Sequence, residues 1–248
     1  MKLDYFDLID NSPFYVEGIG NLKPPKLKDI KNIKYKTYQL YLSFIVVTYE
    51  QYVAMEKNID TSLYKSFYEL IINNRSLIDI YLEVFSFFIS DSIIFNTENN
   101  SFIIFKINEE DDNDEQFKIL GVINGENFDY TRLCLAQLNH LSLDEIKPAT
   151  YKNDRARKIA EKLEKKLLEN KSADEGLDLP HTISKYCAIN TSGINLLNVY
   201  EMSVFQLYEQ FGEAQIIRKS DVQDLIYANS VSFSDAKSYN SDLWLTKL

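Results

Sequence analysis

Residues 92–107 read SIIFNTENNSFIIFKI, and this stretch predicts a β-hairpin. Two runs rich in isoleucine and phenylalanine flank a polar tip at residues 96–100. β-Branched and aromatic residues favour strands, and a short polar segment between two such runs favours a turn. The sequence FKILGVI at residues 117–123 is compatible with a third strand. We therefore expect a small antiparallel sheet near the middle of the chain.

The sequence before the hairpin predicts helices. Between Leu27 and Tyr52 apolar residues recur at spacings of three and four, which predicts one long helix. Shorter helices are expected at residues 63–72 and 77–89. The second of these is apolar nearly all round, which is typical of a helix at the centre of a core. Its polar residues form one narrow stripe, namely Asp79, Glu83, Ser86 and Ser90.

Helices are also expected after the sheet. Asp129 is a candidate N-cap for a helix at residues 131–141, and Pro180 is expected to open a helix that ends near residue 189. The helix at residues 153–170 is the most clearly amphipathic, and its charged surface is interpreted as solvent-exposed rather than as a binding site. Further helices are predicted at residues 194–211 and about 220–228.

The expected fold class is therefore α+β, predominantly helical with one small antiparallel sheet. A soft boundary near residues 148–153 would separate an N-terminal part, residues 1–150, from a helical C-terminal part, residues 151–248. The alternative is that the chain forms one domain, since 248 residues fit either arrangement.

The composition limits the partners that the protein can bind. The chain carries 27 basic and 37 acidic residues, and its formal net charge is −10. This balance opposes general binding to duplex DNA and to anionic membrane surfaces, both of which attract cationic proteins. The first residues include acids where a signal peptide needs an apolar segment, and the apolar runs are too short to span a membrane. We expect a soluble, cytoplasmic protein that binds neither nucleic acid nor membrane.

No pattern of catalytic or metal-binding residues stands out. The two cysteines, Cys134 and Cys187, lie far apart and are expected to be reduced core residues. The two histidines, His140 and His181, have no nearby partner at a ligand spacing and are interpreted as helix-end residues. The acidic run EEDDNDE at residues 109–115 lacks the glycine and the glutamate that an EF-hand needs. We expect no metal, no cofactor and no enzymatic activity.

The stretch EGIGNLKPPKLKDIKNI, residues 17–33, does not fit a phosphate-binding loop either. It lacks the third glycine and a preceding strand, and no GK[ST] follows. It is interpreted as a turn at residues 18–21, followed by prolines that start a helix near Pro25.

Two blocks of the chain resemble a known family. PFYVEGIGNLKPPKLKDIKNIKYKTYQLYL, residues 13–42, resembles the opening of tail-module proteins encoded by phages and prophages of Gram-positive bacteria. GINLLNVYEMSVFQLYEQFGEAQ, residues 193–215, resembles a second signature of the same family, and SDLWLTKL, residues 241–248, is similar to its terminal aromatic phrase. The chain departs from the family pattern at residues 228–240.

The resemblance implies a non-enzymatic role in building a phage tail. Proteins of this family are commonly described as tail assembly chaperones, so the expected partner is another tail protein, such as the tape measure. A structural tail, neck or baseplate subunit that stays in the virion is the alternative, and a phage-encoded metal-dependent nuclease is less favoured. The expected location is the cytoplasm of the bacterial host, or the virion if the structural alternative holds.

Aromatic residues are the candidates for partner binding. Most tyrosines on the predicted helices are expected to lie in the core, but some could form an interface with a partner or in a homo-oligomer. The candidate partner-binding residues are Tyr38, Tyr41, Tyr200, Tyr208, Phe211 and Trp244.

Overall fold

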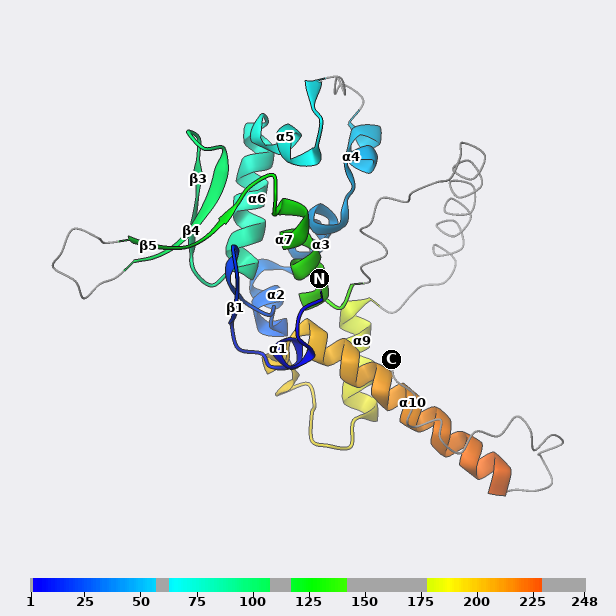
Figure 1. Ribbon diagram of the computed structural model, residues 1–248. Helices are drawn as coiled ribbons and strands as arrows, with labels where there is room; N and C mark the ends of the chain where they lie inside the picture. Colours follow the sequence, from blue (N-terminus) through cyan, green and yellow to red (C-terminus); the bar gives the residue numbers. More distant parts are fainter. Residues whose placement is uncertain (1, 57–62, 108–116, 142–177, 229–248) are drawn as a thin grey trace. The chain divides into compact units, whose positions relative to one another are not determined.

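The computed structural model describes residues 2–56, 63–107, 117–141 and 178–228 (Figure 1). The fold is α+β and predominantly helical, with small antiparallel sheets, as the sequence predicts. The chain divides into two compact units, and we describe each by itself. Unit 1 comprises residues 1–148 together with residues 201–205, which we call the closing segment, and unit 2 comprises residues 149–200 and 206–248. The predicted boundary at 148–153 lies outside the described residues and stays a prediction.

Unit 1 begins with a short helix and a hairpin. Helix α1 spans Tyr5–Ile9, and strands β1 (Phe14–Val16) and β2 (Gly20–Leu22) pair antiparallel. The expectation that no strand precedes the glycines was therefore wrong, and the turn lies at residues 17–19 rather than 18–21. Gly18 and Gly20 have φ angles of 78° and 105°, which residues with a Cβ atom rarely adopt. Only three residues long, β1 is too short to show a period-2 pattern in the sequence.

The turn of this hairpin packs directly on strand β5 (Phe117–Ile123). The Val122 N–H donates to the Gly18 carbonyl at 3.0 Å. A Cβ atom on Gly121 would lie 2.5 Å from the carbonyl carbon of Ile19, so the backbones approach so closely that position 121 has no room for a side chain. The side chain of Ile19 is fully buried. The glycines of EGIGN therefore serve packing between a turn and a strand.

The predicted long helix between Leu27 and Tyr52 is in fact three helices. They are α2 (Leu27–Ile33), α3 (Tyr35–Val46) and α4 (Tyr49–Met55). The first break falls at Lys34, whose φ of 77° lies outside helical values. The second falls at Thr48, which caps α4 by a capping box with Gln51. Both breaks interrupt the backbone without interrupting the apolar spacing, which is why the periodicity predicted one helix.

Helices α5 (Phe67–Ile72) and α6 (Arg75–Phe88) form the centre of unit 1. The Asn74 side chain caps α6 by accepting from the backbone N–H groups of Ser76 and Leu77. The predicted polar stripe, from Asp79 to Ser90, is exposed, and the rest of α6 is largely buried. The prediction of a central helix with one polar edge is confirmed.

The predicted three-stranded sheet is confirmed. Strands β3 (Ser92–Asn96) and β4 (Ser101–Ile107) form the hairpin, and β5 pairs antiparallel with β4. One face of this sheet packs on the core, where Phe102, Ile104 and Ile123 are fully buried and the Phe85 ring of α6 lies 5.2 Å from that of Phe102. The register shifts between Ile104 and Phe105, which places an irregularity in the middle of the sheet.

Helix α7 (Phe128–Leu138) follows the sheet. Its N-cap is Asn127, so the prediction of Asp129 as N-cap was wrong, and Asp129 lies in the first turn instead. At its end the His140 N–H donates to the Gln137 carbonyl and the Leu141 N–H to the Ala136 carbonyl, the pattern of a Schellman motif. With a φ of 55°, His140 terminates the helix through its backbone.

Aromatic rings fill the core of unit 1 around a buried arginine. The Arg132 guanidinium lies 5.3 Å from the ring centroid of Phe67 and 5.6 Å from that of Phe128. It donates to the carbonyls of Ile45, at 2.9 Å, and Val47. Arg132 thus neutralises carbonyl groups that the end of α3 leaves without helical partners.

Unit 2 contains α9 (Leu179–Ile189), two residues of a 3₁₀ helix at Val199–Glu201, and most of α10 (Val204–Ala228). The helix opened by Pro180 is confirmed, with Asp178 as N-cap. The predicted helix at residues 194–211 begins ten residues later, and it continues without a break through the helix predicted near 220–228. The reason is local: asparagine side chains hold residues 190–198 in turns, which compete with a helix. The predicted helix at 153–170 lies outside the described residues.

Candidate functional site

The two-proline stretch PPKLK, residues 24–28, lies against the closing segment within unit 1. The Leu27 N–H donates to the Met202 carbonyl at 2.9 Å, and the Val204 N–H donates to the Pro25 carbonyl at 3.0 Å. Proline lacks an N–H group but keeps its carbonyl, which here accepts from a distant part of the chain. The two blocks that carry the family resemblance therefore meet through backbone hydrogen bonds.

An ion pair on the surface accompanies these backbone bonds. Lys28 Nζ lies 2.7 Å from Glu201 Oε2, and the Asn11 side chain donates to the Glu201 carbonyl at 2.8 Å. The hydrogen bond with Lys28 lowers the pKa of Glu201, and the same bond raises the pKa of Lys28. Because both side chains are exposed, the pair adds little to stability and mainly marks where the closing segment lies.

The predicted partner-binding residues Tyr38 and Tyr41 are buried in unit 1. The Tyr38 hydroxyl donates to the side-chain oxygen of Asn139, and the Tyr41 hydroxyl lies 3.5 Å from a carboxylate oxygen of Glu83. Burial raises the pKa of Tyr41. Both rings contribute to the core, and their role in partner binding stays a prediction.

The other predicted residues lie in the C-terminal part of the chain. Tyr200 lies in the 3₁₀ helix, and Tyr208 and Phe211 lie on α10; all three are half-buried. Trp244 lies outside the described residues. The structure therefore brings Tyr208 and Phe211 onto one helix of unit 2, whereas Tyr38 and Tyr41 belong to unit 1.

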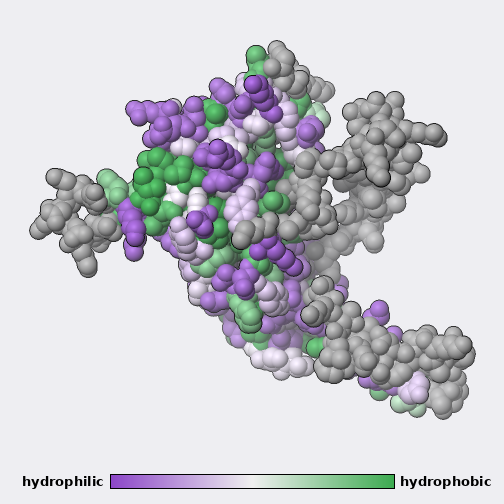
Figure 2. Space-filling model, in the orientation of Figure 1, coloured by the Kyte–Doolittle hydropathy of each residue, from purple (hydrophilic) through white to green (hydrophobic). Residues whose placement is uncertain are grey.

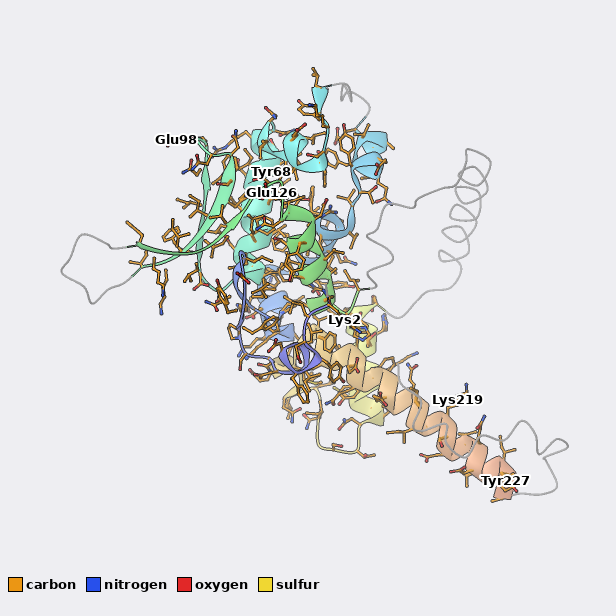
Figure 3. The ribbon with its side chains drawn as sticks, in the orientation of Figure 1. Lys2, Tyr68, Glu98, Glu126, Lys219 and Tyr227 are labelled. Atoms are coloured by element: carbon orange, nitrogen blue, oxygen red, sulfur yellow. The ribbon has the colours of Figure 1, made fainter. Side chains whose placement is uncertain are left out.

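The last turns of α10 present apolar side chains to solvent. Val222, Leu225 and Ile226, which we call the α10 surface, follow the spacing of one helix face and are exposed. Leu225 is 71% exposed. Ile217 and Tyr227 on the same helix are half exposed as well, and Figure 3 shows side chains projecting along α10 as far as Tyr227. Clustered exposed apolar residues of this kind mark protein-binding sites.

A second exposed apolar group lies in the turn region of unit 2. Leu197 is 93% exposed, and its neighbour Leu196 is also exposed. The turn is fixed from within, because Asn195 Oδ1 accepts from the Leu197 N–H and Asn198 Oδ1 accepts from the Asn195 N–H. These hydrogen bonds hold a turn that leaves two leucines exposed to solvent, which makes the turn a second candidate contact surface.

Burial is the main cause of the pKa shifts among the ionisable groups of the described residues. Most resolved pKa shifts belong to tyrosines and cysteines whose burial raises their pKa; the pKa of Tyr68, for example, is raised to about 12. The Tyr68 hydroxyl holds the tip of the β3–β4 hairpin by donating to the Asn100 carbonyl at 2.7 Å. Within the described ranges no three His, Cys, Asp or Glu side chains gather into a metal-binding group.

Local structure accounts for the positions of His181 and of the two cysteines. His181 lies in the first turn of α9, as predicted, and its ring Nδ1 is 2.7 Å from Asp178 Oδ1. Hydrogen bonds from His181 lower the pKa of Asp178. Cys134 is buried and Cys187 is half-buried, and both are free thiols.

The comparison with known families concerns the C-terminal part of the chain. Residues 169–248 match the model of the YomV second domain. YomV is a Bacillus phage/prophage protein, so this similarity supports a phage-associated origin. The matched range contains α9, α10, the exposed turn leucines and the 193–215 block. No curated protein and no solved structure matches the chain.

Sequence reasoning did not single out the α10 surface, the turn leucines or the closing segment. The α10 surface is predictable, because Val222, Leu225 and Ile226 follow the i, i+3, i+4 spacing of one helix face. The closing segment is not predictable, because its hydrogen bonds to the two-proline stretch use backbone groups, which every sequence has. Among the helices of the described residues, none is long and apolar enough to cross a membrane.

Proposed function

We propose that this chain is a non-enzymatic phage tail assembly protein, a chaperone that binds another tail protein such as the tape measure. The observation that carries the proposal is the α10 surface, because it exposes clustered apolar side chains within the range that is similar to a domain of a phage/prophage protein. The tail role itself rests on the resemblance of the 13–42 and 193–215 blocks to tail-module proteins.

The proposed contact is helix against helix. A partner with an amphipathic helix would lay its apolar stripe on Val222, Leu225 and Ile226. Fully burying an aliphatic side chain is favourable by about 1.5 to 3 kcal/mol, so burial of these three residues would contribute to binding. Lys219 and Asp224, which are both exposed on α10, would lie at its polar rim. The chaperone would thereby cover apolar surface that tail subunits later occupy.

The test is co-expression with the product of the longest reading frame that neighbours this chain's own. We expect a complex that co-purifies and a larger soluble fraction of the partner. Leu225→Glu should weaken the complex at least tenfold, because it places a charge in an apolar contact. Leu40→Glu is the matched control, since Leu40 is an exposed leucine on a helix of unit 1 and should leave binding unchanged.

The results distinguish the proposal from its alternative. If wild type forms no complex, or if Leu225→Glu binds as well as wild type, the proposed contact is wrong. Mass spectrometry of purified particles separates a chaperone, which is absent from the virion, from a structural tail subunit, which is present at a fixed stoichiometry.

A further inference from the structure

The β3–β4–β5 sheet has two apolar faces, and only one of them packs on the core. Alternate residues of a strand point to opposite faces, so the strand register assigns the outer face. Ile94 is paired with Ile103, Ile103 with Val122, and Phe105 with Ile119, while Ile107 is paired with Phe117. The outer sheet face therefore contains the apolar residues Ile94, Ile103, Phe105, Ile107, Phe117, Ile119 and Val122, together with the uncharged polar residues Ser92, Asn96 and Ser101.

Much of this outer sheet face is exposed to solvent. Four of its residues are at least half exposed, at 50% for Ile94, 51% for Ile107, 59% for Phe117 and 61% for Ile119. Figure 2 shows hydrophobic residues gathered where Figure 1 draws β3 and β4. Together the four leave on the order of 400 Å² of surface exposed, the size at which an apolar patch marks an interaction site.

An antiparallel sheet with one wet face normally alternates apolar and polar residues. Here the inward residues Phe102, Ile104 and Ile123 alternate with outward residues most of which are just as apolar. A sheet that is apolar on both faces is the pattern of a sheet covered on both faces.

We propose that the outer sheet face is covered by the same face of a second copy of this chain, so that the protein is a homodimer. Two three-stranded sheets would pack face to face, about 10 Å apart, as the layers of a β-sandwich do. The inference concerns unit 1 and stands independently of the chaperone role assigned to the α10 surface.

The composition of the outer sheet face favours a second copy of this chain as its partner. No charged side chain lies in it, so two copies bring no unpaired charge together, and homodimer interfaces are the more apolar class. Lys106 and Lys118, which are paired with each other, belong by register to the opposite face. The Phe105 and Phe117 rings, 5.4 Å apart, form an aromatic pair on the outer face that suits a sheet-to-sheet contact.

The area also suits a dimer. With the half-buried Ile103, Phe105 and Val122 included, two such faces would bury on the order of 1,000 Å² in total, which is the lower bound for a specific interface. An interface of this size forms a reversible dimer. Each copy carries a net charge of −10, so two copies repel each other. Salt screens this repulsion, and association should therefore strengthen as salt is added.

Sedimentation velocity of the full chain over a range of concentrations tests the proposal. We expect a monomer–dimer equilibrium that shifts toward the dimer with concentration. Ile119→Lys and Phe117→Ser should each weaken the dimer by tenfold or more, since each removes one of the most exposed apolar side chains of the outer sheet face. Phe6→Lys is the control, because Phe6 is exposed on α1, outside the sheet, and should leave the equilibrium unchanged.

Each outcome decides for or against the dimer. Circular dichroism and thermal unfolding of Ile119→Lys should match wild type, because the position is exposed in the monomer. If wild type stays monomeric at every concentration, the proposal is overturned. If a dimer forms but neither sheet variant weakens it, the dimer uses another surface and the assignment of the outer sheet face is wrong.

Discussion

Arg132 shows how one residue joins three helices of unit 1. It lies on α7, donates to carbonyls at the end of α3, and packs its guanidinium on the ring of Phe67 from α5. Arginine suits this position because its planar group donates several hydrogen bonds and also stacks on aromatic rings. The burial of Arg132 is not predictable from the sequence, since an arginine in a predicted helix is ordinarily solvent-exposed.

Replacing Arg132 with methionine should lower the free energy of unfolding by about 2 to 4 kcal/mol, because buried carbonyls lose their donor. Chemical denaturation followed by circular dichroism measures the effect. Arg75→Met is the matched control: Arg75 is exposed and pairs with Asp79 at 3.2 Å, so its loss should cost less than about 1 kcal/mol. Equal effects of the two changes would show that the Arg132 contacts contribute nothing particular.

At the scale of elements, the hairpin turn that packs on β5 makes Gly121 critical. In Gly121→Ala the new methyl group would lie 2.5 Å from a backbone atom of Ile19, so the turn or the strand must move. We expect a loss of about 2 kcal/mol or more in the free energy of unfolding. Gly125→Ala provides the comparison, because its methyl group would meet only the Tyr68 ring, at 3.4 Å. A Gly121→Ala protein as stable as Gly125→Ala would contradict the packing described.

Elements whose signals are local were predictable from the sequence. Strand residues of β3, β4 and β5 alternate or cluster by type, and Pro180 marks the start of α9, so these were correct. Helix ends were harder, because Lys34 breaks a helix through its backbone angle and leaves the apolar spacing intact. At residues 190–198, asparagine side chains hold the backbone in turns and also leave the apolar spacing intact.

The candidate site was less predictable than the fold. Tyrosine is a typical interface residue, but Tyr38 and Tyr41 are buried by packing that a single sequence does not display. The sequence does not predict the exposure of aliphatic residues such as Leu225 and Leu197, because a hydrophobic residue in a predicted helix is ordinarily interpreted as part of the core.

At the scale of the whole molecule, the closing segment connects distant parts of the chain within unit 1. Val204 is buried, and its N–H bonds to the Pro25 carbonyl. Val204→Ala should destabilise this contact by about 2 kcal/mol, so the Leu27 amide, which bonds to Met202, should exchange its hydrogen about 30-fold faster.

Val222→Ala is the matched control, since it makes the same change at an exposed position of the same helix. It should leave exchange at Leu27 unchanged. If both variants exchange alike, or if neither affects Leu27, the closing segment does not support unit 1.

The closing segment also sets the order of events during synthesis. Unit 1 needs residues 201–205, but Leu27 leaves the ribosome long before Met202 does. At the usual rate of about 5 to 20 residues per second, the interval is about 10 to 35 s. For that time the Pro25 carbonyl and the Leu27 N–H lack their native partners. Completion of the N-terminal unit is therefore timed by translation of the C-terminal part, and a chain truncated before residue 201 would lack the segment that completes its first unit.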